Sequence, residues 1–133
     1  MLYLLQIRNE KCVLKFANSH KKPYLCSQMI VVFEKEYLQE LYVKGSTTNR
    51  KYWFQPQIVT KYMKVINMMK QMENVQGLMK YGSLHYEKLH GDKEGTSSVR
   101  VNDQYRIEFT ETIEEGNTVA TICIITELSN HYQ

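Results

Sequence analysis

The segment 89–109, LHGDKEGTSSVRVNDQYRIEF, decides the fold of this chain. Two runs of strand-like residues, 96–101 and 105–112, lie on either side of a short polar turn, and this pattern is typical of a β-hairpin. Arg100 and Arg106 flank the turn. We therefore expect both arginines on paired strands, where a rigid sheet would hold two cations close together.

The segments around this hairpin predict the remaining elements. Residues 118–128, TVATICIITEL, are the most β-prone run and predict a central strand. Upstream, residues 29–33 predict a short buried strand, and apolar residues at helical spacing predict helices over 34–43, 56–72 and 73–80. This order predicts an α+β domain in which an N-terminal strand and the helices pack on one face of an antiparallel sheet.

The charge of the chain is distributed unevenly along its 133 residues. The net charge is +3, but residues 1–28 carry five Lys or Arg and one Glu, whereas residues 29–133 carry 12 basic and 13 acidic side chains. We therefore expect a main domain over 29–133 preceded by a separable segment, 1–28, which is either an arm or strand or the product of an upstream start with Met29 as the natural initiator. Nucleic-acid binding by the main domain would depend on local clustering of cations.

Cysteine usage and hydropathy favour a cytoplasmic protein. Cys12, Cys26 and Cys123 are odd in number and form no CxxC motif, which fits a reduced compartment. No apolar run approaches the roughly 20 residues that span a membrane, and the apolar N-terminus has no basic leader of the kind that precedes a secretory signal. We expect neither a membrane association nor a cofactor.

Three cations of the hairpin region are candidates for binding phosphate. Arginine donates two parallel hydrogen bonds from a planar, permanently charged group, so Arg100 and Arg106 suit this role, and Lys93 lies in the loop before the first strand. The alternative is that the arginines are ordinary surface residues in ion pairs with Glu108 or Asp103.

Two further groups of residues offer acid–base chemistry. His85, Glu87 and His90 precede a glycine-bounded loop and offer a general base or acid, or they belong to a solvated linker. The two histidines are five residues apart, which matches no compact zinc spacing, so we expect no metal. At the C-terminus, His131 and its two neighbours follow the central strand and either reach a site on the sheet or are frayed.

Most of the aromatic side chains are predicted to pack in the core. Tyr37, Tyr42 and Tyr62 lie at helical spacing, and we expect the tyrosines and Trp53 to be packing residues rather than a platform for bases. In the short helix over 73–80, we expect Val75, Leu78 and Met79 to point inward.

The segment quoted first resembles the HigB-like toxins of the RelE/ParE superfamily of bacterial toxin–antitoxin systems. The family pattern, L-x-G-D-r-x-G-x-x-S-I-R-V-N-x-x-x-R-I-x-F, is met at nearly every position by residues 89–109, and the resemblance extends from Met29 to the end of the chain. It implies a compact α+β toxin that cleaves mRNA on the 70S ribosome without a metal and that is neutralised by a helix-turn-helix, HigA-like antitoxin.

The resemblance also implies roles for the candidate residues. Attack of a ribose 2′-OH on the adjacent phosphate needs a base, an acid and cations that stabilise the negative charge. Lys93, Arg100 and Arg106 would stabilise the negative charge. His131 would be the main acid or base, and Glu87 or His85 would be the second such group. Substrate would be contacted by four residues: Asn130, Tyr132, Tyr105 and His90.

The chain departs from the family pattern at two places. It ends in Asn-His-Tyr where many relatives have Asp-Tyr-His, and Glu87 stands where many relatives have a histidine, with His85 two residues away. The resemblance therefore leaves two alternatives to the nuclease open. One is a ParE-like protein that inhibits DNA gyrase without nuclease chemistry, and the other is a degenerate toxin that only binds its antitoxin.

Overall fold

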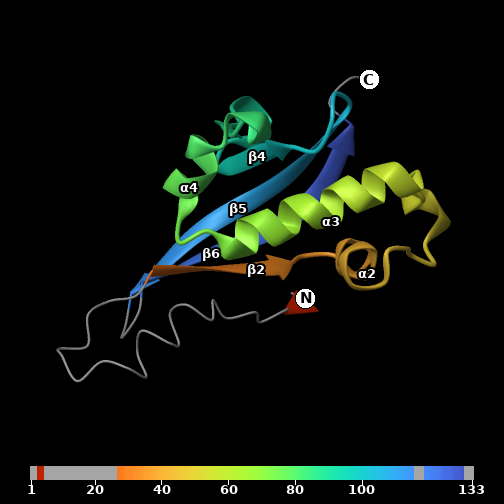
Figure 1. The fold of residues 1–133 in the computed structure, drawn as a ribbon, viewed down its shortest axis with the longest axis horizontal. Helices are drawn as coiled ribbons and strands as arrows, with labels where there is room; N and C mark the ends of the chain where they lie inside the picture. Colours follow the sequence, from red (N-terminus) through yellow and green to blue (C-terminus); the bar gives the residue numbers. More distant parts are fainter. Residues whose placement is uncertain (1–2, 5–26, 116–118, 131–133) are drawn as a thin grey trace.

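The protein is built on one mixed six-stranded sheet. The computed structural model describes residues 3–4, 27–115 and 119–130, and the order of strands across the sheet is β1-β2-β6-β5-β4-β3 (Figure 1). The strands are β1 (Tyr3–Leu4), β2 (Ser27–Phe33), β3 (Glu87–Lys88), β4 (Thr96–Arg100), β5 (Tyr105–Glu115) and β6 (Val119–Asn130).

The α+β class and the hairpin meander predicted from the sequence are confirmed. Strands β4, β5 and β6 are antiparallel neighbours, as the polar turns indicated. The opening strand β2 pairs with β6 in parallel, however, so the sheet is mixed and not wholly antiparallel as expected. Two parallel strands need a long crossover connection, and here the helices and the β3–β4–β5 meander supply it. β1 extends the sheet by pairing antiparallel with β2.

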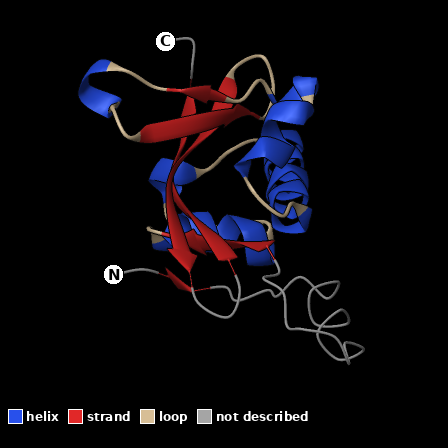
Figure 2. Cartoon of the chain, turned by 90° about the vertical axis from the view of Figure 1, so that its left-hand side faces the viewer, coloured by secondary structure: helices blue, strands red, loops and turns tan. Residues whose placement is uncertain are grey.

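Three helices occupy the connection between β2 and β3. They are α2 (Glu36–Lys44), α3 (Pro56–Gln71) and α4 (Val75–Lys80). Pro56 stands in the first turn of α3, where its missing N–H costs nothing. Gly45 ends α2 with a φ of 77° and donates its N–H to the carbonyl of Leu41, a left-handed conformation that glycine adopts without strain. The long helix α3 lies along one side of the sheet (Figure 2).

The core lies between α3 and the sheet. The buried face of α3 meets side chains from β2, β5 and β6, and the largest fully buried residues are Tyr62, Phe33, Phe109, Met29 and Leu38. Tyr37 and Tyr62 are buried as predicted, and Tyr42 is half-buried. Three expectations were wrong: Met79 is 54% exposed, Trp53 is 65% exposed and Tyr81 is 49% exposed. Helix α4 has only six residues, so it turns a single residue, Leu78, fully into the core.

A bulge interrupts the pairing of the two central strands. Glu108 pairs with Glu127, but the next residue, Phe109, pairs with Ile125, so Thr126 is the inserted residue on β6. Its hydroxyl donates to the carbonyl of Glu108 at 3.1 Å, which ties the extra residue back to β5. In the part of the chain that the structure describes, no helix is long and apolar enough to cross a membrane.

Candidate functional site

The register of the meander gathers charged side chains on the sheet face turned away from α3. Arg100 pairs with Arg106, and Arg106 pairs with Ser129; residues directly opposite one another point to the same face. Glu108 and Glu127 follow two residues further along the same face, while Ile107 and Leu128 point to the core. We call this polar end of the sheet the candidate site.

Arg106 is fixed at the centre of the candidate site. Its side chain is 10% exposed, and its Nε donates to the hydroxyl of Ser98 at 2.9 Å. One terminal nitrogen donates to the carbonyl of His85 at 2.5 Å. The carboxylate of Glu87 lies 3.5 Å from Nε. These partners from β3, β4 and the segment before β3 hold the guanidinium in one position, as bonded groups in a low-dielectric setting do.

Lys93 reaches over the same face from the short turn η3 (Gly91–Lys93). Its ammonium donates to both carboxylate oxygens of Glu108 at 2.8 and 2.9 Å, and Glu127 lies 3.9 Å away. The hydrogen bond to Glu108 raises the pKa of Lys93, so the amine stays charged at neutral pH. Its side chain is 51% exposed, and it is the most accessible of the three predicted phosphate ligands.

Arg100 forms the ion pair that the alternative interpretation predicted. Its guanidinium bonds the carboxylate of Asp103, three residues along in the β4–β5 turn. Within the described residues each of the three cations thus has a carboxylate neighbour: Asp103 for Arg100, Glu87 for Arg106 and Glu108 for Lys93. A phosphate would have to replace or join these carboxylates.

The structure places the remaining predicted residues around the rim of the candidate site. His85 has a φ of 44° and an exposed side chain, and its carbonyl accepts from Arg106. His90 is exposed directly before η3. Tyr105 and Asn130 pair at the end of β5 and β6, and both are half-buried. They adjoin Arg106 and Ser129 along the strands, but they share the face of Ile107 and Leu128 and so point away from the candidate site.

His131 and Tyr132 lie outside the described residues, so their predicted roles stay predictions. No group of three His, Cys, Asp or Glu that could hold a metal ion is found among the described residues.

The sequence interpretation named Glu108 only as a possible partner of the arginines, and it missed the acidic and phenolic group that Glu108 forms with Glu127 and Tyr37 beside Lys93. Glu108 is buried beside Lys93, and Glu127 and Tyr37 complete the group. Burial raises the pKa of Tyr37, and the nearby carboxylate of Glu127 adds to the effect. The ring of Tyr37 stacks on that of Tyr52, with centroids 3.6 Å apart. One signal was present in the sequence, because Glu108 stands two residues after Arg106 on a strand and must share its face.

Comparison with known families identifies the class of protein that has this α+β fold with a polar end of the sheet. Residues 31–122 match the model of the family described as the RelE-like toxin of type II toxin–antitoxin system HigB. The chain therefore belongs to the HigB-like toxins, and the resemblance noted in the sequence is confirmed. It is a type II toxin–antitoxin toxin related to RelE.

Two of the solved structures that the chain matches are toxins of bacterial toxin–antitoxin systems or complexes containing one. The YoeB/ParE toxin from Agrobacterium tumefaciens is 16% identical, with a TM-score of 0.47, and the match covers 77% of this chain and 98% of that one. The YoeB-YefM complex from Staphylococcus aureus is 19% identical, with a TM-score of 0.38, covering 80% of this chain and 100% of that one. No curated protein matches the sequence.

Proposed function

We propose that this toxin is a metal-independent endoribonuclease that cuts mRNA on the ribosome and so arrests translation. The observation that carries the proposal is the fixed guanidinium of Arg106, which lies 3.5 Å from the Glu87 carboxylate and directly opposite Arg100. A phosphate-binding cation beside a carboxylate on a rigid strand is the arrangement that attack of a 2′-OH on phosphorus requires.

The proposed chemistry divides the roles among the side chains already described. Glu87, or His85 in its place, takes the proton of the 2′-OH, whose oxygen then attacks the adjacent phosphorus. Arg106, Arg100 and Lys93 stabilise the negative charge that develops on the phosphate oxygens. His131 gives a proton to the departing 5′-oxygen, which leaves a cyclic phosphate and a free 5′-OH.

We assign four residues of the rim to substrate contact. They hold the two nucleotides on either side of the cut, and they are Asn130, Tyr132, Tyr105 and His90. Each of the three cations has a carboxylate partner, and this argues for an enzyme that depends on the ribosome to present its RNA. A candidate site whose phosphate ligands are partly neutralised binds free RNA only weakly by itself, because affinity for a phosphate backbone follows the number of phosphates neutralised.

We further propose that the partner in the cell is a cognate helix-turn-helix antitoxin of the HigA type and that the toxin acts in the cytoplasm. The family is defined as the toxin half of a two-protein system, which supports an antitoxin as the neutralising partner. The solved S. aureus relative is itself a complex of two named proteins.

The carboxylates around the cations favour one alternative, a degenerate toxin that binds its antitoxin without cutting RNA. In that case Asp103, Glu87 and Glu108 would be permanent partners of the cations rather than groups that phosphate displaces. The cleavage test below separates the two functions, because a degenerate toxin would leave transcripts intact while still binding its antitoxin.

Expression of the chain alone, with mapping of the 5′ ends of cellular transcripts, tests the proposal. We expect new ends that carry a 5′-OH and follow the reading frame. Lys93→Ala and His131→Ala should abolish these cuts, and the Arg106→Lys variant, which keeps a cation in the buried position, should reduce them. The control is Lys88→Ala, an exposed lysine on β3, which should cut normally. Transcripts without new ends, or cuts that persist in both alanine variants, would show that the proposal is wrong; inhibited supercoiling by purified gyrase would instead favour the ParE-like function.

A further inference from the structure

Residues 29–133 are nearly neutral in total, but their basic and acidic side chains are concentrated in different parts of the sequence. From Leu41 to Met72 the chain has six Lys or Arg and no Asp or Glu, whereas the rest of residues 29–133 has six basic and 13 acidic side chains. Five of those six cations are exposed, and only Lys70 is buried. The exposed cations come from the end of α2, from the α2–α3 connection and from the outer side of α3. They are Lys44, Arg50, Lys51, Lys61 and Lys64.

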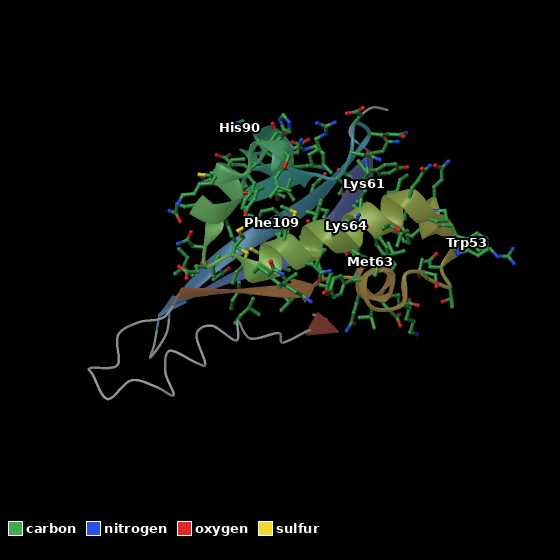
Figure 3. All side chains as sticks on the ribbon, in the orientation of Figure 1. Trp53, Lys61, Met63, Lys64, His90 and Phe109 are labelled. Atoms are coloured by element: carbon green, nitrogen blue, oxygen red, sulfur yellow. The ribbon has the colours of Figure 1, made fainter. Side chains whose placement is uncertain are left out.

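The α2–α3 connection holds an aromatic side chain among these cations. Trp53 is 65% exposed, and its indole nitrogen donates to the carbonyl of Thr47 at 2.9 Å, which fixes the ring at the surface. The guanidinium of Arg50 lies 5.8 Å from the centre of this ring, and the ammonium of Lys51 lies 5.5 Å from the ring of Tyr52. We call the five exposed cations and Trp53 the basic–aromatic surface; Figure 3 labels Trp53 at the end of the molecule and Lys61 and Lys64 along α3.

The outer side of α3 favours a nucleic acid over a peptide as the partner of this surface. A docked peptide helix needs an apolar stripe, but after Pro56 in the first turn every exposed position of α3 is polar or basic: Gln57, Thr60, Lys61, Lys64, Asn67 and Gln71. Cations along a backbone combined with an exposed ring that can stack on a base are the features by which proteins bind single-stranded nucleic acid.

The basic–aromatic surface is continuous with the candidate site. Tyr52, next to Trp53, stacks on Tyr37 with ring centres 3.6 Å apart, and Tyr37 lies beside the Glu127 carboxylate of the candidate site. Phe54 packs edge-on against Tyr105, which belongs to the core face of β5. A cavity of about 360 Å³ between α3 and the β4–β5 turn is lined by Lys61 and by residues 102–104, among others. Acidic groups that border the surface include Asp103, paired with Arg100, and Glu40, hydrogen-bonded to Thr47, as well as Glu127 near Tyr37.

We propose that the basic–aromatic surface binds single-stranded RNA, with phosphates on the exposed cations and one unstacked base on Trp53. The α2–α3 connection is then a second RNA contact that leads toward the candidate site from outside it. The inference goes beyond the proposed cleavage, because it concerns binding and holds whether or not the bound RNA is cut.

The experiment measures binding of a 2′-O-methyl oligouridine, which lacks the attacking hydroxyl and is not cleaved. Trp53 is the only tryptophan, so we expect the oligonucleotide to quench the intrinsic fluorescence of the full chain. With a fluorescent label on the RNA, anisotropy should show Trp53→Ala binding at least about fivefold more weakly, the lower end of measured base–aromatic stacking. Lys61→Gln/Lys64→Gln should lower the slope of log K against log salt by about 1.4, or about 0.7 for each lost phosphate contact.

The matched control is Lys35→Gln/Lys80→Gln, which removes the same charge from exposed positions outside residues 41–72. We expect this variant to retain the salt slope of the wild type and nearly all of its affinity. Three outcomes would overturn the inference: unchanged Trp53 fluorescence on saturation with RNA, an equal loss of affinity in the control, or stronger binding of polyglutamate than of oligouridine at this surface. Loss of transcript cleavage with intact oligouridine binding would refute the proposed function alone.

Discussion

Replacing Lys70 with methionine should stabilise the protein, although lysine is the native residue. Lys70 lies on the buried side of α3 and is 7% exposed, and its ammonium has no hydrogen-bond partner within the described part of the chain. It lies 3.8 Å from the ring centre of Tyr42. An unsatisfied buried polar group lowers the free energy of unfolding by about 1–3 kcal/mol, and a desolvated cation–π contact raises it by about 0.5–2 kcal/mol.

The balance predicts a gain for Lys70→Met of about 1 kcal/mol in the free energy of unfolding at neutral pH, because methionine fills a similar volume without a charge. Burial lowers the pKa of Lys70 from 10.5 to about 8. Between these pH values the unfolded chain binds the proton and the folded chain does not, so the stability of the native protein rises with pH there. The advantage of methionine should therefore shrink as the pH is raised above about 8.

Urea denaturation followed by circular dichroism at a series of pH values measures both effects. Lys64→Met on the exposed side of the same helix is the control, and it should change stability by less than about 0.5 kcal/mol. The reasoning is refuted if Lys70→Met unfolds at a lower urea concentration than the native protein at pH 7, since the cation–π contact would then outweigh the cost of burial.

Four further predictions concern the rest of the chain. A chain beginning at Met29 should fold and remain toxic, as judged by circular dichroism and growth arrest; failure to fold would make the preceding segment integral. In a Cys12→Ser/Cys26→Ser variant, the remaining Cys123 should react with a thiol reagent only after unfolding, because burial raises its pKa to about 12, and fast labelling of the folded chain would contradict this. Gly45→Ala should cost about 1 kcal/mol in denaturation experiments, since its φ is positive. Tyr62→Phe should cost about 1 kcal/mol by loss of its buried hydrogen bond to α2, and an unchanged midpoint would argue against that bond.

The sequence predicted the elements of the fold better than it predicted their pairing. Periodicity places the hairpin and α3 within a few residues of their observed bounds, because the apolar faces of a strand and a helix repeat at fixed intervals. The parallel pairing of β2 with β6 depends on how a long connection returns across the sheet, and this leaves no local pattern. Met79 was misplaced because a six-residue helix has too few turns to bury a whole face.

The candidate site was predictable in part for a similar reason. The shared face of Arg100 and Arg106 follows from the two-residue repeat of strands around a turn. The sequence also allowed the pair of Arg100 with Asp103, but not the carboxylate beside Arg106, because Glu87 reaches it from the separate strand β3. Nor does the repeat of a strand show that Lys93 bonds Glu108, because Lys93 lies in a turn outside the strands. Trp53 was assigned to the core from its residue type, whereas a hydrogen bond from its ring nitrogen to a loop carbonyl holds it at the surface.

The extra residue in β6 has a consequence for which changes in sequence this protein can tolerate. Side chains alternate between the two faces along a strand, so the insertion at Thr126 decides to which face each later side chain of β6 points. As a result, Glu127 and Ser129 share the face of Arg106. Substitution of Thr126 leaves these directions unchanged, whereas deletion of Thr126 would turn Glu127 and Ser129 to the opposite face although neither residue is itself changed. Many side chains here can therefore be exchanged one at a time, but a change of length by one residue in β6 would turn Glu127 and Ser129 away from the polar face together.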